Sequence, residues 1–367
     1  MRQTDQKLMG LERQRARYDR NRIEPHLQQL FLEVTARCNL SCIHCGSRCD
    51  EHAAVAELDF ACLEAVLKRV REAFGTRVFV VLTGGEPLLR PDVFDLGTLI
   101  SDLGFAWGMT TNATLIDAAC ARRLVASGLR SVSVSLDGTP DVHDAVRRRI
   151  GSHEAAVKGI ENLAATEGLG ALQVTSVLNH QTIGCVDDLF EVVKDLPIDS
   201  WRLANVEPIG SALAHPEILF TPSDYRLLFD YIRQKREDKW PVEYGCCHYL
   251  GLADEGNLRG WFFLCNAGIH VMGVTHTGDI VSCLDIERRP ETVFGNVLTD
   301  DVAEVWKRGF EIFRAPDGLA GRAKMCAGCP DRRFCRGDSA HSFDYEHGRP
   351  RVCMRRDLPG FESVAAG

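Results

Sequence analysis

The sequence lacks any long apolar segment. No run reaches the roughly 18 apolar residues that a membrane-spanning helix needs. The first 22 residues are too polar for a signal peptide, because no apolar stretch follows their charges. Positive charge is not in excess either: 43 Lys and Arg against 51 Asp and Glu give a net charge of −8. We therefore expect a cytoplasmic protein with no general affinity for nucleic acid or for membranes.

Cysteine, in contrast, is abundant, with 15 residues in a chain of 367. Cytoplasmic thiols stay reduced, so clustered cysteines there are more often metal ligands or catalytic groups than disulfides. An odd number also fits poorly with a disulfide framework. The composition, 45% hydrophobic and 26% charged, is globular, and the length suits one large domain plus a smaller one.

Residues 29–240 alternate β-branched runs with amphipathic stretches of helical spacing. The strand-like runs are 30–36, 77–83, 105–111, 131–137, 172–178 and 200–206. The helix-like stretches are 58–74, 91–104, 117–128, 153–168, 187–196 and 222–238. Six strand–helix units predict an α/β fold with a parallel sheet, either doubly wound or an incomplete barrel. Functional groups then gather at the carboxyl ends of the strands.

The first strand is followed by four cysteines, in the stretch CNLSCIHCGSRC. The spacing Cys38-x3-Cys42-x2-Cys45 offers three thiolates within one loop, and Cys49 adds a fourth. A closed zinc site needs four ligands, whereas a [4Fe–4S] cluster held by three thiolates leaves one iron open. At this point a disulfide scaffold, a zinc site and an iron–sulfur cluster all remain open.

The second strand ends in VVLTGGEP, residues 80–87. Gly84 and Gly85 allow the backbone to approach a ligand closely, and exposed carbonyl groups together with Glu86 can accept hydrogen bonds from an ammonium group. Pro87 completes the motif, whose structural alternative is a turn before a helix. With the three-cysteine loop, this pattern resembles the radical S-adenosylmethionine (SAM) enzymes over the first ~220 residues.

The resemblance implies a partial (β/α)6 TIM-type barrel and a reaction. Cys38, Cys42 and Cys45 would hold a [4Fe–4S] cluster whose open iron binds SAM. One electron then cleaves SAM to a 5′-deoxyadenosyl radical, which abstracts hydrogen from the substrate. Further cofactor-binding candidates lie at strand ends or beside the cluster loop: His44, Thr111, Asn112, Ser135, Asp137, Arg147 and Asn179. Their alternatives are strand-end capping and, for His44, a solvent-facing loop position; Cys49 is expected to be a free thiol.

After residue 245 the regular alternation fades, and the remaining ~120 residues contain eight cysteines. Such a loop-rich domain lacks an apolar core, so bound metal is expected to stabilise it. The pattern Cys265-x12-Gly278-x4-Cys283, then Cys326-x2-Cys329-x5-Cys335 and Cys353, resembles the SPASM auxiliary-cluster domain, with structural zinc as the alternative. Residues 276–286 match its β-hairpin, and 294–306 match the strand and helix that follow.

This part of the chain departs from the family pattern at one position, because Ser339 stands where a fourth cysteine is expected. The resemblance implies a distal cluster on Cys326, Cys329, Cys335 and Cys353. It leaves a proximal cluster with Cys265 and Cys283, to which Cys246 or Cys247 could add a thiolate. One or two auxiliary clusters are expected. Asp285 lies close to where sulfatase-maturing relatives place a proton acceptor; a surface acid is the alternative.

The sequence therefore predicts four regions: an N-terminal helical extension (1–28), the radical SAM barrel (29–240), a linker or bridging region (241–262) and the SPASM domain (263–367). The predicted function is oxidative modification of a ribosomally made peptide, giving a C–C, C–O or thioether cross-link. The alternatives are a sulfatase maturase that forms formylglycine and a non-catalytic zinc or iron–sulfur scaffold. The expected partners are a peptide or protein substrate and a flavodoxin or ferredoxin reductase. Only about 28 residues precede the first strand, so recognition of the leader peptide is expected to use either a separate leader-peptide-binding protein or the barrel and SPASM surfaces themselves.

Overall fold

The computed structural model describes residues 3–49 and 56–364. The outer ends of the first and last predicted regions, residues 1–2 and 365–367, lie outside this description. Among the described residues no helix is both long and apolar enough to cross a membrane. A sheet of ten strands organises the fold, in the order β10-β9-β8-β1-β2-β3-β4-β5-β6-β7, and β11 and β12 form a second, two-stranded sheet.

The strands are β1 (Gln29–Thr35), β2 (Phe79–Gly84), β3 (Trp107–Thr111), β4 (Leu129–Ser135), β5 (Ala171–Leu178), β6 (Ser200–Asn205), β7 (Val242–Tyr244), β8 (Val271–Val274), β9 (Asp279–Val281), β10 (Val293–Asn296), β11 (Phe343–Asp344) and β12 (Arg349–Pro350). The α-helices are α1 (Gln3–Ile23), α2 (Phe60–Phe74), α3 (Val93–Asp102), α4 (Ala118–Ala126), α5 (Pro140–Arg147), α6 (Ser152–Ala164), α7 (Val186–Val193), α8 (Pro222–Glu237), α9 (Gly251–Asp254), α10 (Val302–Arg308), α11 (Glu311–Arg314), α12 (Arg332–Cys335) and α13 (Met354–Asp357). Short 3₁₀ turns are η1 (Pro87–Leu89), η2 (Ile183–Cys185), η3 (Gly210–Ala214), η4 (Pro216–Ile218), η5 (Gly318–Gly321) and η6 (Lys324–Cys326).

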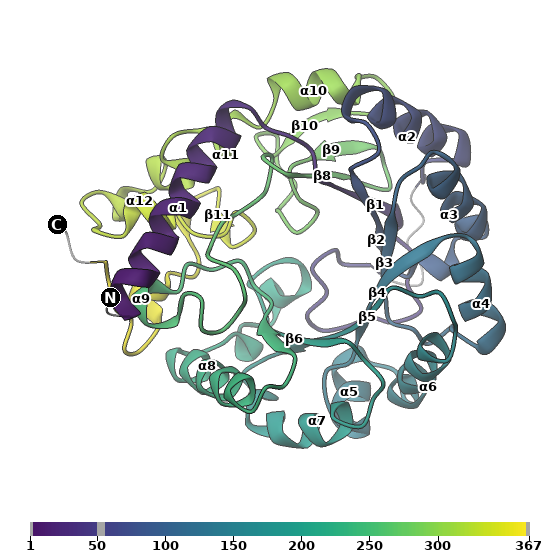
Figure 1. The fold of residues 1–367 in the computed structure, drawn as a ribbon, viewed down its shortest axis with the longest axis horizontal. Helices are drawn as coiled ribbons and strands as arrows, with labels where there is room; N and C mark the ends of the chain where they lie inside the picture. The colour runs from purple at the N-terminus through teal and green to yellow at the C-terminus, as the bar shows by residue number, and fades with distance from the viewer. Residues whose placement is uncertain (1–2, 50–55, 365–367) are drawn as a thin grey trace.

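The predicted α/β partial barrel is confirmed. Strands β1–β6 pair in parallel with their sequence neighbours, and the helices that connect them lie outside the strands (Figure 1). Helix α2 shows how the sequence sets the ends of a helix. Asp59 caps its first turn by accepting a hydrogen bond from the Cys62 N–H, and Gly75 ends it with a φ of 73°. Its buried residues, Leu63, Val66, Leu67 and Val70, follow helical spacing and join the main core.

The sheet extends beyond the six predicted strands at both edges. Strand β7 pairs in parallel with β6, so the first part of the expected linker belongs to the barrel sheet. At the other edge, β8 pairs in parallel with β1, and β8, β9 and β10 form an antiparallel meander. The predicted C-terminal hairpin and the strand and helix after it are present, as β8–β9, β10 and α10. No local pattern in the sequence indicates that this hairpin continues the barrel sheet.

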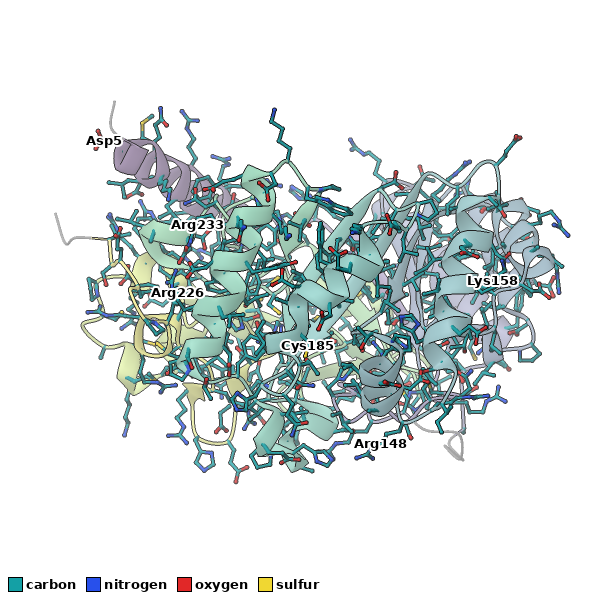
Figure 2. All side chains as sticks on the ribbon, turned by 90° about the horizontal axis from the view of Figure 1, so that it is seen from below. Asp5, Arg148, Lys158, Cys185, Arg226 and Arg233 are labelled. Atoms are coloured by element: carbon teal, nitrogen blue, oxygen red, sulfur yellow. The ribbon has the colours of Figure 1, made fainter. Side chains whose placement is uncertain are left out.

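Helix α1 packs against the C-terminal elements rather than against the barrel helices (Figure 1). The buried Tyr18 hydroxyl donates to the Phe313 carbonyl at 2.6 Å, and Lys7 Nζ donates to the Leu252 carbonyl at 2.9 Å. On the barrel side, Arg226 and Arg233 of α8, labelled in Figure 2, both bind the fully buried Asp254. Charged and polar contacts therefore hold the bridging region against α1 on one side and against the barrel helix α8 on the other.

The end of β2 is packed directly on the chain that leaves β1. A Cβ atom added at Gly85 would lie 2.0 Å from the Arg37 carbonyl oxygen, which is backbone and has little room to move. We predict that Gly85→Ala lowers the free energy of unfolding by about 1–3 kcal/mol, the usual cost of overpacking. Urea unfolding of the anaerobic protein measures the change.

Gly184→Ala is the matched control, because an added Cβ there meets no atom within 4 Å. Its stability is expected to stay within about 0.5 kcal/mol of wild type or to rise slightly. Equal unfolding midpoints for Gly85→Ala and wild type would show that the β1–β2 contact is not rigid.

Candidate functional site

A polar or thiol-bearing residue follows each of the six barrel strands. In strand order they are Cys38, Glu86, Asn112, Asp137, Asn179 and Glu207. Parallel strands bring their carboxyl ends to one rim, so these residues gather at the same end of the barrel. Five of the six had been predicted as site residues. Glu207 had not been predicted, although it too is a polar residue that follows a barrel strand, β6.

The four cysteines of the first loop pack together. Cys38 and Cys49 are buried, and Cys42 and Cys45 are partly buried against them. All 15 cysteines are free, which excludes disulfides in this structure. Burial raises the pKa of Cys38 to about 12, while a hydrogen bond from Cys49 lowers the pKa of Cys45 to about 6. Thiols crowded in this way bind a cationic centre that replaces their protons, so the loop fits a metal cluster.

The two glycines of GGEP allow close packing against the protein's own backbone, rather than against the predicted cofactor. An added Cβ at Gly84 would lie 2.3 Å from the Thr35 carbonyl oxygen, and Gly85 is equally confined by Arg37. The Gly85 N–H donates to the Thr35 carbonyl, and the Glu86 N–H donates to the Arg37 carbonyl. The close approach is thus to the chain that leads into the cysteine loop. The motif fixes where that loop begins.

The Glu86 carboxylate is fully buried and tied to the end of β3. Its two oxygens accept bonds from Thr111 Oγ1 at 2.8 Å and from the Asn112 N–H at 2.9 Å. Burial raises the pKa of Glu86 to about 7. Asn112 in turn donates to Asn39 Oδ1 at 2.8 Å, beside Cys38. Pro87 is buried and begins η1, the turn considered as its structural alternative, and its cofactor-binding role stays a prediction. These contacts join GGEP, β3 and the cysteine loop.

A buried ion pair lies at the end of β4. Arg147 Nε donates to Asp137 Oδ2 at 2.7 Å, and Arg147 Nη1 lies 3.5 Å from Cys42 Sγ. Arg147 comes from α5, a helix that the sequence analysis missed. It had been predicted as a cofactor-binding residue, and in this structure its guanidinium group binds the protein's own Asp137. Ser135, at the end of β4, is partly buried.

Three buried polar atoms on the rim have no hydrogen-bond partner in the described part of the chain: His44 Nδ1, Asn179 Nδ2 and Glu207 Oε2. The His44 side chain is only 8% exposed, with Nε2 3.8 Å from Asp137 Oδ2, so the solvent-facing alternative is wrong. Burial lowers the pKa of His44 to about 4, which keeps the ring neutral. Unpartnered buried polar atoms call for a ligand. The rim therefore fits a polar cofactor beside the cysteine loop.

The C-terminal domain gathers its thiols in two groups. The predicted distal ligands all line one cavity of about 340 Å³: Cys326, Cys329, Cys335 and Cys353. Burial raises the pKa of Cys326 to about 11, and the neighbouring Cys353 and Cys329 thiols add to this shift. Four thiols around one cavity fit an iron–sulfur cluster or a zinc ion.

The second group contains Cys247, Cys265 and Cys283. Burial raises the pKa of Cys247 to about 12, with Cys265 adding to it, and both thiols contribute to the raised pKa of Cys283. Of the two upstream candidates, Cys247 is therefore the one beside these thiols, whereas the buried Cys246 faces the Asn205 carbonyl. The exposed Asp285 lies near this group; its predicted proton-accepting role stays a prediction.

The side chain of Ser339, which stands where the family pattern has a cysteine, is hydrogen bonded within the protein. Ser339 is fully buried, and its hydroxyl is 2.9 Å from His341 Nδ1. The neighbouring Asp338 also carries an oxygen donor, but it binds His248 at 2.5 Å. His248 and His341 had not been predicted as functional residues, because no motif or regular spacing marks them.

The sequence matches two family profiles: the radical SAM superfamily over residues 32–193 and the SPASM iron–sulfur cluster-binding domain over 265–330. It is 31% identical to mycofactocin maturase MftC of Mycobacterium ulcerans, over 90% of this chain and 91% of that protein. It is 26% identical to the AdoMet-dependent heme synthase of Methanosarcina barkeri, over 88% and 95%. The fold is similar to that of Streptococcus suis SuiB bound to S-adenosylmethionine, with a TM-score of 0.69, 17% identity and coverage of 93% and 77%.

The barrel, the three-cysteine loop and these matches define an enzyme, and the chain belongs to the radical SAM superfamily. Within that superfamily it is one of the members that carry a SPASM domain after the barrel. Its cofactors are accordingly a [4Fe–4S] cluster, S-adenosylmethionine and auxiliary iron–sulfur centres. The non-catalytic scaffold considered from the sequence is set aside.

The Asp137–Arg147 pair yields a stability prediction. Asp137→Asn keeps the shape of the side chain but leaves the buried Arg147 without its carboxylate. Removing one partner of a buried pair costs about 3–5 kcal/mol, because the remaining charge stays buried. We expect a loss of this size in the free energy of unfolding. Glu161→Gln is the control, since its pair with Lys158 is exposed and should contribute no more than about 0.5 kcal/mol. Equal losses in the two variants would contradict a buried pair.

Proposed function

We propose that this radical SAM enzyme oxidatively modifies a ribosomally made peptide, forming a C–C, C–O or thioether cross-link. The observation that carries the proposal is the 31% identity to a mycofactocin maturase along nearly the whole of both chains. Auxiliary clusters support it further. Bond formation after hydrogen abstraction leaves one electron to remove, and an iron–sulfur centre can accept it.

In this proposal Cys38, Cys42 and Cys45 hold the first cluster. When bound, the cluster and SAM supply reductive carbon–sulfur cleavage and a radical able to abstract hydrogen. The protein's own residues position and shield this chemistry. Glu86, buried at the rim, would help to hold the polar end of SAM, and His44 and Asn179 would offer it their unpartnered atoms. Arg147 lies beside Cys42 and stabilises its thiolate.

The auxiliary centres are assigned to the two C-terminal thiol groups. Cys326, Cys329, Cys335 and Cys353 hold the distal cluster, around the cavity that they line. Cys247, Cys265 and Cys283 supply three thiolates to the proximal one. Electrons enter from a flavodoxin or ferredoxin reductase, and a separate protein presents the leader part of the peptide.

Cys42→Ala tests the first cluster. Cys42 is one of three thiols and lies next to Arg147, so its loss should prevent cluster assembly while the barrel stays folded. We expect no 5′-deoxyadenosine after dithionite reduction with SAM, measured by liquid chromatography, and an unchanged circular dichroism spectrum. Cys62→Ala, on the outer helix α2, is the control and should retain wild-type yield. Full activity of Cys42→Ala would refute the ligand assignment.

The substrate class is tested with peptides encoded beside the gene. The enzyme is incubated with SAM, reductant and each peptide, and the products are analysed by mass spectrometry. A cross-link removes two hydrogens, so we expect a loss of about 2 Da, with 5′-deoxyadenosine formed in step. An aldehyde on a sulfatase-derived peptide would favour the formylglycine alternative.

The heme synthase relative raises a second candidate, a tetrapyrrole substrate, because its similarity also spans nearly the full length. The same incubation with a heme precursor in place of the peptide separates the two. Turnover of the precursor without turnover of any peptide would overturn the peptide proposal.

A further inference from the structure

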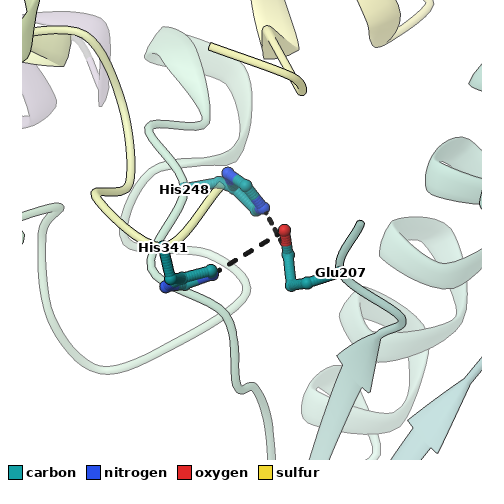
Figure 3. A group of neighbouring side chains, drawn as sticks. All are labelled: Glu207, His248 and His341. Carbon is teal, nitrogen blue, oxygen red and sulfur yellow. Dashed lines mark hydrogen bonds and ion pairs between the residues drawn. The ribbon is translucent and has the colours of Figure 1, made fainter. Parts of the chain in front are cut away.

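Three side chains from distant parts of the sequence meet between the barrel and the C-terminal domain. Glu207 follows β6, His248 lies in the bridging region, and His341 belongs to the loop after α12 (Figure 3). Their side chains are 9%, 0% and 15% exposed. The thiol ligands proposed above are not part of this group, so it is a separate constellation.

The three side chains point possible metal-ligating atoms at one another. His248 Nε2 lies 2.7 Å from Glu207 Oε1, and His341 Nε2 lies 3.7 Å from Glu207 Oε2. One ligand atom from each residue falls within 4.8 Å of the other two. Two imidazoles and one carboxylate are a common donor set for divalent transition metals such as Zn²⁺ and Fe²⁺.

Each of the three residues also forms a hydrogen bond with a polar side chain outside the group. His248 Nδ1 is 2.5 Å from Asp338 Oδ2, and His341 Nδ1 is 2.9 Å from Ser339 Oγ. Asn205 Nδ2 donates to Glu207 Oε1 at 2.9 Å. Histidines that bind a metal through one ring nitrogen almost always hold the other in a hydrogen bond, often to a carboxylate. The two histidines follow this rule. Of their other nitrogens, His248 Nε2 is hydrogen bonded to Glu207 Oε1 and His341 Nε2 lies 3.4 Å from Ser339 Oγ, and these two nitrogens would be the ligand atoms of an ion.

One atom of the group remains unsatisfied without an ion. Glu207 Oε2 is buried and has no hydrogen-bond partner among the described residues. The 3.7 Å to His341 Nε2 is too long for a hydrogen bond. A metal-free network, with a charged His248 between Glu207 and Asp338, satisfies His248 but leaves Glu207 Oε2 with only the 3.7 Å ion pair to His341 and no hydrogen bond. A buried carboxylate oxygen without a partner is costly, and an ion at this point would remove the cost.

We infer that Glu207, His248 and His341 form a mononuclear site for a divalent transition metal of the Zn²⁺ or Fe²⁺ type. The ion joins the barrel rim, the bridging region and the C-terminal domain, segments that chain connectivity alone leaves free to separate. It is distinct in chemistry from the clusters, because none of its ligands is a thiolate. The inference does not depend on which substrate the enzyme modifies.

Zinc binding to the reconstituted enzyme tests the site. Anaerobic protein with its iron–sulfur centres assembled is incubated with Zn²⁺, passed through a desalting column and analysed for zinc by mass spectrometry. We expect wild type to retain about one zinc ion per chain more than His341→Ala. His347→Ala is the matched control: this histidine is in the same domain, is 61% exposed and contacts Asp344 instead. It should bind as much zinc as wild type.

Two further measurements do not depend on activity. Zinc X-ray absorption of the wild-type protein should show nitrogen and oxygen neighbours, with the imidazole signal lost in His341→Ala. The thermal midpoint should rise with zinc in wild type and His347→Ala but not in His341→Ala, because an ion that binds only the native state stabilises it. If His341→Ala fails to assemble its iron–sulfur centres, Glu207→Gln is measured in its place. Equal zinc contents in wild type and the ligand variant, zinc bound through sulfur alone, or no retained zinc would each overturn the site.

Discussion

Strand β1 forms backbone hydrogen bonds on both of its edges, and the arrangement of the molecule depends on this. One edge pairs with β2, which begins the barrel, and the other pairs with β8, which begins the C-terminal meander. The cysteine loop leaves the carboxyl end of β1, and Cys283 follows β9 in that meander. The two cysteine-bearing regions are therefore connected through strand β1, which forms backbone hydrogen bonds to both of them.

A buried charge strengthens this junction. Glu33, in β1, is only 3% exposed, and its carboxylate accepts a bond from His276 Nδ1 at 2.8 Å and pairs with Arg288 at 3.1 Å. Both partners belong to the C-terminal domain. Burial by itself would raise the pKa of Glu33, but the bond from His276 and the charge of Arg288 more than offset it and keep the pKa low. Because contact between the domains lowers the pKa of Glu33, the ionised carboxylate stabilises that contact at neutral pH, and the contribution is lost as the pH falls from the ordinary pKa of a glutamate through the lowered one.

The sequence was informative where periodicity or spacing reports structure directly. Six strands, their helices and the rim residues at their ends follow from alternation, because parallel strands must end on the same side. Arg147 was named from its residue type, but not its pairing with Asp137, since α5 is short and its only signals are Pro140 and a few apolar residues. The junction of β8 with β1 joins residues more than 200 positions apart, and local patterns carry no information on such contacts. Cys247 and Cys246 were equal candidates, because only side-chain direction separates them.

The substitution of cysteine by serine at 339 is explained by what the neighbouring loop does. Ser339 directs its hydroxyl at His341, and Asp338 binds His248, so neither oxygen is free to replace the absent thiolate. Cys265, by contrast, accepts a backbone bond from Ala340, which keeps the same loop against the proximal thiols. The loop therefore lies beside Cys265 through its backbone, while the side chains of Asp338 and Ser339 contact the histidines of the group around Glu207. A proximal cluster would then be held by three thiolates, from Cys247, Cys265 and Cys283, and this loop would supply it with no fourth ligand, because its Ser339 and Asp338 side chains hold the two histidines instead.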